Sequence, residues 1–186
     1  MVIFLSFLHI VYILSLFLLL CVLIVYLQSL LLTRVPFLWL SQKKLPEILD
    51  ALKLTSSAVL YDLGCGDARV LFAATRRVPN ARCVGVDVAL AAYLLARLRR
   101  WYVGNPKNVT LIKANFFNLD LSNATHIYCY LYPNVMDELH QKFLKQLKPG
   151  TRVISCDFEI AHKTAIEVIQ FKKNSRLGKS LYVYEY

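Results

Sequence analysis

An acid and two glycines follow a short apolar run, at a position where such residues could bind a ligand. Asp62, Gly64 and Gly66 come after the run that begins at Ala58, and a helix-like pattern starts at Val70. This order predicts a strand, a tight turn and a helix, and in parallel α/β sheets such a turn lies at the edge where ligands bind. Glycines let the backbone approach a ligand closely. Unpaired N–H groups at the amino end of the helix would point toward it.

Two cofactor-binding patterns use a turn of this kind. The dinucleotide fingerprint requires glycine at its first, third and sixth positions, which here are Gly64, Gly66 and Arg69. Because a bulky cation replaces the third glycine, a nicotinamide enzyme is disfavoured. The other pattern, acid-x-Gly-x-Gly, is matched by Asp62, Gly64 and Gly66. It resembles the first motif of class I methyltransferases that depend on S-adenosylmethionine (SAM). Those often carry a third glycine, where this chain has Ala68.

Polar residues also follow the next two predicted strands. Asp87 lies about twenty residues beyond the glycines, where a carboxylate can accept hydrogen bonds from ribose hydroxyls; the alternative role is a helix N-cap, where Asp is also favoured. Asn115 and Phe116 follow the third strand. The resemblance implies that an amide here contacts the adenine amino group and that its apolar neighbour packs on the ring. Alternatively, Asn115 caps a short turn and Phe116 belongs to the core.

The expected cofactor site thus combines the glycine turn with the ends of two neighbouring strands. We expect SAM to be held by Asp62, Gly64, Cys65, Gly66, Asp67, Asp87, Val88, Asn115 and Phe116.

An aromatic segment follows the fourth predicted strand, and the resemblance implies that this loop faces the transferred methyl group. It contains Tyr130, Tyr132 and Pro133, our candidates for the catalytic residues, and it offers no strong base. Methyl transfer from a sulfonium is a direct displacement, so alignment can supply much of the rate. An aromatic face can also hold an ammonium group, although rim packing is the alternative for Tyr132. Asp157 and Glu159 follow the fifth strand and could hold a basic substrate side chain or simply be solvated.

Strands and helices must alternate to position these residues. Hydrophobic periodicity predicts helices over 44–54, 67–77, 89–101 and 134–147, and strands over 58–63, 82–87, 108–113, 125–131 and 151–156. Such alternation implies a parallel sheet with right-handed crossovers. The segments 166–171 and 180–186 read as two antiparallel edge strands. We therefore predict an α/β fold, a Rossmann-like class I methyltransferase sheet of five parallel strands with a C-terminal antiparallel hairpin.

The first 33 residues contain no Asp, Glu, Lys or Arg, and roughly 20 apolar residues suffice to cross a bilayer as a helix. A signal peptide fits poorly, because there is no basic n-region, the apolar run is long and no small-x-small site follows. We expect an uncleaved transmembrane helix over 3–32. Arg34, Lys43 and Lys44 follow it. The positive-inside rule then favours a single-pass protein whose catalytic domain faces the cytoplasm or the mitochondrial matrix.

Composition limits the remaining classes. The 186 residues carry a net charge of +10, and 57% of them are hydrophobic, against roughly 45–50% in ordinary soluble domains. The five cysteines and four histidines have no metal-ligand spacing, so we expect no metal and free thiols in a reducing compartment. The cations are spread without an aromatic-interleaved basic motif, which makes nucleic acid an unlikely partner. Anionic lipid head groups explain the charge equally well.

We divide the chain into a transmembrane anchor (1–33), a juxtamembrane link and helix (34–57) and a SAM-dependent methyltransferase domain (58–186). The whole pattern looks most like the small, membrane-anchored methyltransferases related to the ATP synthase c-subunit lysine methyltransferase. The resemblance rests on the segments DLGCGDARV, VGVDV, YCYLYPNVM, LKPGTRVIS and LYVYEY.

This resemblance implies methylation of a lysine on a membrane protein of energy metabolism. Two alternatives stay open, because class I folds serve many acceptors. One is a methyltransferase of a lipid, small-molecule or RNA acceptor. The other is a catalytically inactive SAM-binding membrane module.

Overall fold

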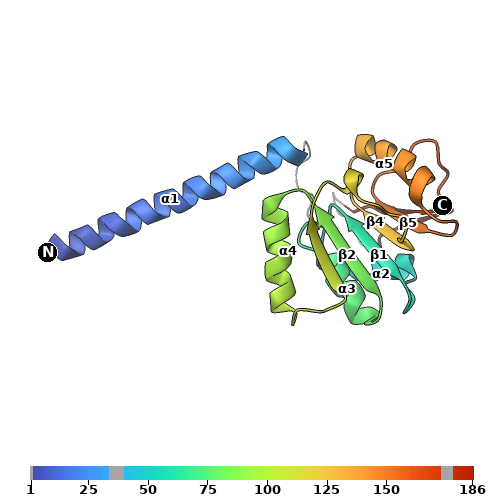
Figure 1. Ribbon diagram of the computed structural model, residues 1–186, viewed down its shortest axis with the longest axis horizontal. Helices are drawn as coiled ribbons and strands as arrows, with labels where there is room; N and C mark the ends of the chain where they lie inside the picture. Colours follow the sequence, from blue (N-terminus) through green and yellow to red (C-terminus); the bar gives the residue numbers. More distant parts are fainter. Residues whose placement is uncertain (1, 34–39, 173–177) are drawn as a thin grey trace.

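The computed structural model describes residues 2–33, 40–172 and 178–186, and it consists of an α/β domain from which one long helix projects (Figure 1). Its helices are α1 (Val2–Thr33), η1 (Gln42–Lys44), α2 (Leu45–Leu52), α3 (Arg69–Arg77), α4 (Leu90–Tyr102), η2 (Phe116–Asn118) and α5 (Pro133–Gln146). Its strands are β1 (Val59–Leu63), β2 (Arg82–Asp87), β3 (Val109–Lys113), β4 (His126–Cys129), β5 (Arg152–Cys156), β6 (Glu167–Gln170) and β7 (Ser180–Glu185).

All seven strands form one sheet in the order β3-β2-β1-β4-β5-β7-β6. The first five are parallel, whereas β7 runs antiparallel to both β5 and β6. The predicted fold class is therefore confirmed, including the C-terminal hairpin. The strand order reverses between β1 and β4, and in open α/β sheets ligands bind at such a switch point, beyond the carboxyl ends of the strands.

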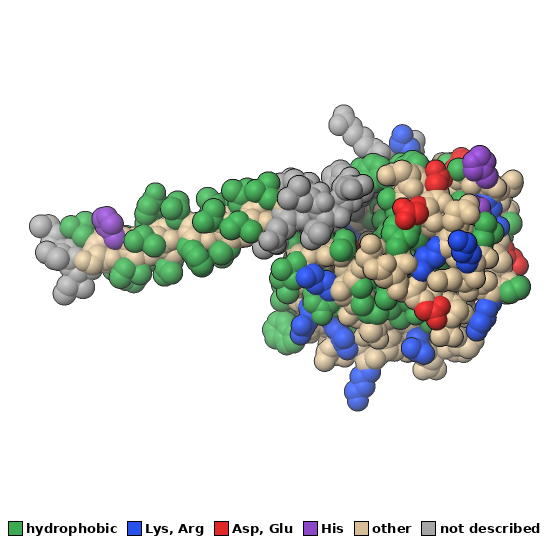
Figure 2. Space-filling view, turned by 45° about the horizontal axis from the view of Figure 1, so that its top comes forward, with side chains coloured by type: hydrophobic (Ala, Val, Ile, Leu, Met, Phe, Trp, Pro, Cys, Tyr) green, Lys and Arg blue, Asp and Glu red, His purple; other side chains and the backbone are tan. Residues whose placement is uncertain are grey.

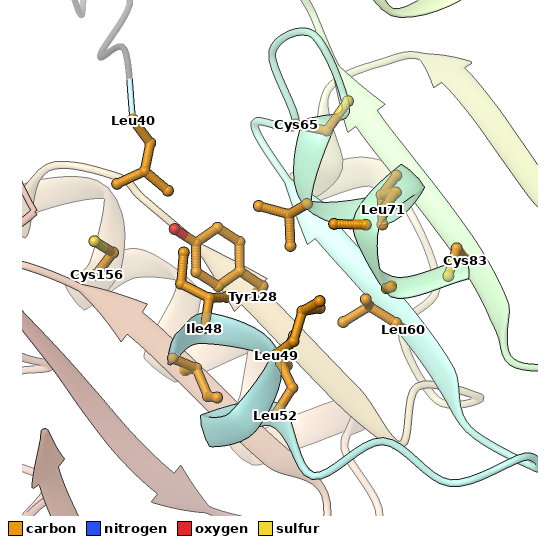
Figure 3. Close-up of a cluster of buried hydrophobic side chains, with 14 of the residues drawn as sticks. Leu40, Ile48, Leu49, Leu52, Leu60, Cys65, Leu71, Cys83, Tyr128 and Cys156 are labelled. Atoms are coloured by element: carbon orange, nitrogen blue, oxygen red, sulfur yellow. The ribbon is translucent and has the colours of Figure 1, made fainter. Parts of the chain in front are cut away.

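Helices cover both faces of the sheet. On one face, α2 and α3 pack on β1 and β4 through a cluster that includes Ile48, Leu60, Leu71 and Tyr128 (Figure 3). On the other face, α5 contributes the fully buried Phe143. Truncating a fully buried leucine such as Leu60 to alanine would lower the free energy of unfolding by about 2–5 kcal/mol. The two clusters therefore fix the strands whose carboxyl ends carry the candidate site.

The apolar amino-terminal segment forms one continuous helix, as predicted. Within α1, the stretch Phe4–Ile24 has a mean hydropathy of 2.8 and is long and apolar enough to cross a membrane, judged by length and composition alone. At 1.5 Å per residue, the 32 residues of α1 extend for about 48 Å, against a hydrocarbon core of roughly 30 Å.

Several local predictions differ from the structure. The strand expected over 125–131 is limited to His126–Cys129. The helix expected from residue 67 begins at Arg69, because Ala68 adopts a left-handed conformation with φ of +58°. The sequence pattern groups Lys44 with the cations beside the membrane, but its side chain is buried in the domain. Its Nζ donates to the Gly178 carbonyl and lies 4.6 Å from the centre of the Phe171 ring.

The segment that leads into α2 enters the domain at Leu40, whose side chain is buried in the cluster of α2 and α3. The Ser41 side chain accepts a hydrogen bond from the Lys43 backbone N–H and caps η1, which leads into α2. The predicted role of Arg34 falls outside the described residues.

Candidate cofactor and acceptor site

The glycine turn joins β1 to α3 at the carboxyl edge of the sheet. Gly64 and Gly66 have φ of +75° and +56°, conformations that glycine adopts without the cost a Cβ would add. The N–H groups of Gly64 and Cys65 both donate to the Val86 carbonyl, at 2.8 and 3.1 Å. A Cβ on Gly64 would lie 2.9 Å from Cδ2 of Leu131. The turn is therefore fixed to the end of β2, and a side chain at Gly64 would require the Leu131 side chain to move.

Asp87 ends β2 and binds this turn. Its Oδ2 accepts from the Gly66 N–H at 3.0 Å, and its Oδ1 accepts from the Ala89 N–H at 2.9 Å. Burial raises the pKa of the carboxyl, and the backbone N–H donors of Ala89, Gly66 and Val88 oppose that shift. The capping alternative is thus present in the structure. Each carboxylate oxygen has a second lone pair, so Asp87 can still accept a ligand hydroxyl.

Asp62 lies directly behind the turn and is almost completely buried. Burial, followed by the charges of Asp87 and Asp67, raises the pKa of its carboxyl well above the ordinary value. Burial also raises the pKa of the Cys65 thiol, with the Asp62 charge adding to the effect. Cys65 therefore remains a neutral thiol that packs in the turn, and it is unsuited to act as a nucleophile.

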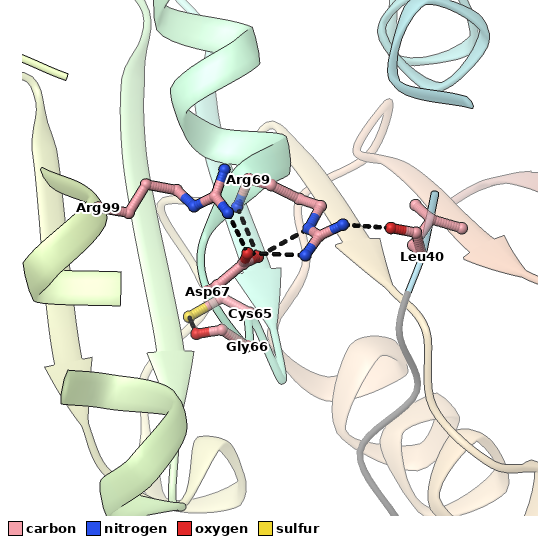
Figure 4. Close-up of polar contacts among 6 residues, drawn as sticks. All are labelled: Leu40, Cys65, Gly66, Asp67, Arg69 and Arg99. Carbon is pink, nitrogen blue, oxygen red and sulfur yellow. Dashed lines mark hydrogen bonds and ion pairs between the residues drawn. The ribbon is translucent and has the colours of Figure 1, made fainter. Parts of the chain in front are cut away.

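Asp67 forms the centre of a buried ion-pair cluster (Figure 4). Arg69 donates through Nε to Oδ1 at 2.8 Å and through Nη2 to Oδ2 at 2.7 Å, a bidentate pair. Arg99 of α4 donates to the same Oδ2 at 2.6 Å. Arg69 also donates to the backbone carbonyl of Leu40. The Asp67 carboxylate thus joins the glycine turn to α4 and, through Arg69, to Leu40.

Sequence reasoning missed both arginines of this cluster. The motif comparison treats Arg69 only as a residue that replaces a glycine, although an opposite charge two positions from Asp67 is a visible signal. Arg99 is separated from Asp67 by 32 positions, so no local pattern could have joined the two residues.

Asn115 and Phe116 lie after β3, next to the end of β2. The Ala114 N–H donates to the Asp87 backbone carbonyl at 3.1 Å, which brings the two strand ends together. The Asn115 side chain is exposed, and its Oδ1 accepts from the Phe117 N–H at 3.0 Å, so it caps η2. Phe116 is half-buried, and its ring centre lies 4.9 Å from that of Phe117. One edge of the sheet thus brings together the turn, Asp87, Asn115 and Phe116.

The aromatic segment after β4 lies beside the loop that follows β5. Tyr132 is the residue before α5, and Pro133 occupies the first helical turn, where proline is favoured because that N–H has no partner in the helix. The Tyr132 ring stacks on Phe158, with ring centres 5.4 Å apart and planes at 25°. Tyr130 lies 6.2 Å from the same Phe158 ring. The structure therefore brings both candidate tyrosines into one aromatic cluster.

Asp157, considered above as a holder of a basic substrate, already has several partners. It accepts a hydrogen bond of 2.8 Å from the Tyr130 hydroxyl and further bonds from the backbone N–H groups of Gly178, Lys179 and Ser180. Burial alone would raise the pKa of this carboxyl, but these donors outweigh it and lower the pKa. Asp157 fixes the start of β7, whereas Glu159 is exposed.

The residues at this edge fit a nucleoside cofactor such as SAM. The turn at Gly64 presents bare backbone with a φ of +75°, Asp87 offers acceptors for hydroxyls, and Asn115 offers an amide next to Phe116. Within the described ranges, no group of three or more His, Cys, Asp or Glu side chains is arranged to hold a metal ion.

Comparisons with known proteins all identify methyltransferases. Residues 62–167 match the family model described as the ANTKMT methyltransferase domain. A protein-lysine N-methyltransferase of Saccharolobus islandicus (strain REY15A) is 33% identical over 156 residues, which cover 81% of this chain and 93% of that protein. The human ATP synthase c-subunit lysine N-methyltransferase is 25% identical over 129 residues. That match covers 69% of this chain and 54% of the human protein, so this chain spans about half of that relative's length.

Solved structures agree with this result. A crystal structure of an RNA methyltransferase from Salinibacter ruber, in complex with S-adenosyl-L-homocysteine, superposes with a TM-score of 0.73 and 28% identity. It covers 80% of this chain and 93% of that one.

Proposed function

The chain belongs to the ANTKMT methyltransferase domain family and is a SAM-dependent methyltransferase, and from this premise we propose that it methylates the side-chain nitrogen of a lysine in a protein. The observation that carries the lysine assignment is the similarity to a protein-lysine N-methyltransferase over 93% of its length. The human relative, whose name gives the ATP synthase c-subunit as its substrate, supports the same acceptor.

We assign the cofactor contacts to the carboxyl edge of the sheet. The backbone of Gly64, Cys65 and Gly66 approaches the cofactor, Asp87 accepts from the ribose hydroxyls, and Asn115 with Phe116 binds the adenine ring. Asp62, Asp67 and Val88 complete this side of the site. Asp67 contributes through its ion pairs, which hold the turn in place. When bound, SAM supplies an electrophilic methyl group on a sulfonium.

The aromatic cluster of Tyr130, Tyr132 and Phe158 is assigned to the acceptor side, together with Pro133. An aromatic face attracts an ammonium group, and desolvation there lowers the pKa of a lysine, so that the neutral amine needed for attack becomes accessible. Burial, and then the bond to Asp157, raise the pKa of Tyr130 far above its ordinary value. Tyr130 therefore stays protonated, and its role is to orient the acceptor.

The acceptor protein would lie near a membrane if α1 spans the bilayer. An anchored domain meets membrane-embedded substrates at a raised effective concentration. We further propose that the domain faces the cytoplasm or the mitochondrial matrix, the side favoured by the lysines after α1. Protease digestion of sealed vesicles tests this orientation: a domain cleaved only from the opposite face would show that the orientation is wrong.

A second candidate is an RNA acceptor, which is favoured by the similarity to the Salinibacter ruber RNA methyltransferase. The segment after β4 reads Tyr-Leu-Tyr-Pro-Asn, and it differs from the Asn/Asp-Pro-Pro-Tyr motif used for amino groups of nucleic-acid bases. The cations are also spread over the chain without a basic motif that follows a phosphate backbone.

One experiment separates these acceptors. The full chain is incubated with methyl-labelled SAM and with membranes that lack the endogenous enzyme, and the label is followed into the protein, lipid and RNA fractions. We expect protease-sensitive label in a membrane protein. Label confined to lipid or to nuclease-sensitive material would reject the lysine assignment while leaving the methyltransferase activity intact.

A further inference from the structure

Helix α4 has its small residues toward the core and its large apolar residues toward solvent. Ala92 and Ala96 are the buried residues of this helix. Leu94, Leu95, Leu98, Trp101 and Tyr102 are 51%, 47%, 62%, 76% and 84% exposed, respectively, and we call these five residues the α4 outer face. A helix that only packs on its own domain shows the reverse pattern, with its large apolar side chains inside.

The five residues form one continuous stripe. Leu94, Leu98 and Trp101 follow the i, i+4, i+7 spacing that aligns side chains on a helix. Leu95 and Tyr102 are also seven positions apart and widen the stripe on one side. A contiguous apolar patch of this kind, as opposed to scattered single residues, marks an interaction site.

Arginines flank the stripe. Arg97 is exposed, and its guanidinium lies 5.9 Å from the centre of the Tyr93 ring. Arg100 is half-buried and donates to the Pro106 carbonyl at 3.3 Å. Arg99 turns to the opposite side, where it binds Asp67. Leucine and tryptophan on one face with arginine beside them are typical of helices that lie in the interface of a membrane, and arginines near the surface attract anionic lipids.

The position of α4 in the domain is consistent with contact with a membrane surface. In Figure 1, α4 is the element of the domain on the side of α1, and it lies across the direction of α1. Hydrophobic and basic side chains gather on the part of the domain next to α1 in Figure 2. Only residues 34–39 separate the end of α1 from Leu40, which is bound to the domain by Arg69. This tether can extend by no more than about 25 Å, so the domain stays close to the end of α1.

We propose that the α4 outer face docks on the surface of a bilayer that contains anionic lipids. The same helix begins at Leu90, three residues after Asp87, and its Arg99 binds Asp67 of the glycine turn. Docking of α4 therefore sets the orientation of the cofactor edge relative to the bilayer. This inference concerns a surface on the opposite side of α4 from the core, and it does not depend on which molecule accepts the methyl group.

Tryptophan fluorescence of the full chain in vesicles tests the proposal. The chain has two tryptophans, so Trp39→Phe leaves Trp101 as the sole reporter. In vesicles of phosphatidylglycerol and phosphatidylcholine, we expect a blue-shifted Trp101 emission that brominated acyl chains quench. In this background, Arg97→Gln should lower the ratio of docked to undocked domain about fivefold. Raised salt should also weaken docking.

A matched pair of substitutions provides the control. Leu98→Glu on α4 should abolish quenching, whereas Leu144→Glu on α5 should leave it unchanged, because the two leucines are 62% and 59% exposed and α5 covers the other face of the sheet. Equal thermal unfolding of the two variants would show that both are folded.

Two results would overturn the proposal. One is a water-like Trp101 emission that brominated lipid leaves unquenched. The other is efficient disulfide cross-linking between two copies through Leu98→Cys without lipid quenching, which would assign the α4 outer face to a dimer.

Discussion

Asp67 and Arg99 are joined by an ion pair of 2.6 Å that connects the glycine turn to α4. Arg69 binds the same carboxylate, and the side chains of Asp67 and Arg69 are only 5% and 6% exposed. The charge of Asp67 is thus compensated within the protein, and its partners fix the position of the turn.

We predict that Asp67→Asn destabilises the protein by about 3–5 kcal/mol, because it removes the buried carboxylate charge that Arg69 binds at 2.7 Å. The free energy of unfolding from denaturant titration measures this loss. Asp50→Asn is the matched control: Asp50 pairs with Arg77 at 2.5 Å on the surface, where the two side chains are 63% and 49% exposed. That surface pair should contribute less than about 1 kcal/mol. Equal losses in the two variants would contradict the role of the cluster.

Gly64→Val should abolish SAM binding, as measured by calorimetry. The new side chain would meet Leu131 at 2.9 Å and would also require an unfavourable φ of +75°. Gly104→Val is a control that tests the effect of backbone strain alone. Gly104 has φ of +88°, and a Cβ added there would meet no atom within 4 Å. We expect Gly104→Val to lower stability by about 1–2 kcal/mol and to retain SAM affinity. A Gly64→Val protein that binds SAM normally would contradict the site.

The raised pKa of Asp62 predicts a distinctive pH dependence of stability. Its carboxyl binds its proton more tightly in the folded than in the unfolded protein. Stability from this group is therefore fully present below the ordinary value of 3.8 and falls as the pH rises toward the folded pKa. Asp62→Asn should be more stable than the original protein at neutral pH and should lose this advantage near pH 4. Denaturant titrations across this range measure the difference, and a variant that is less stable at neutral pH would contradict the prediction.

Tyr132→Ala should reduce turnover more than it reduces SAM affinity. The substitution removes the ring that stacks on Phe158 in the aromatic cluster, whereas the glycine turn and Asp87 remain unchanged. Tyr132→Phe keeps the ring and should retain most of the activity. Steady-state kinetics and SAM calorimetry measure the two effects, and a selective loss of SAM binding would move Tyr132 to the cofactor side.

Much of the fold could be predicted because its signals are local. The apolar runs that end at Leu63, Asp87 and Cys156 are strands of the structure, and the glycine turn lies where the spacing of Gly64 and Gly66 indicated. The start of α3 was missed by two residues, because the left-handed backbone at Ala68 depends on how the turn is fixed to β2.

The remaining features depend on contacts between distant parts of the chain. The buried Lys44 side chain donates to the Gly178 carbonyl, which lies 134 positions away in the sequence. Arg99 likewise binds Asp67 across 32 positions. Helical spacing predicted α4 but not which of its faces packs on the domain. The buried face carries the small residues Ala92 and Ala96. Among the site residues, the structure gives Asp87 and Asn115 capping bonds, and their contacts with SAM stay predictions.

The central claim is tested most directly by locating the transferred methyl group. Membranes that lack the endogenous enzyme are incubated with the full chain and methyl-labelled SAM, and tandem mass spectrometry of the digested proteins identifies the modified atom. We expect label on the side-chain nitrogen of a lysine in a membrane protein, and none when Gly64→Val replaces the original chain. Methylation of any other residue, or of no protein at all while the enzyme consumes SAM, would contradict the account.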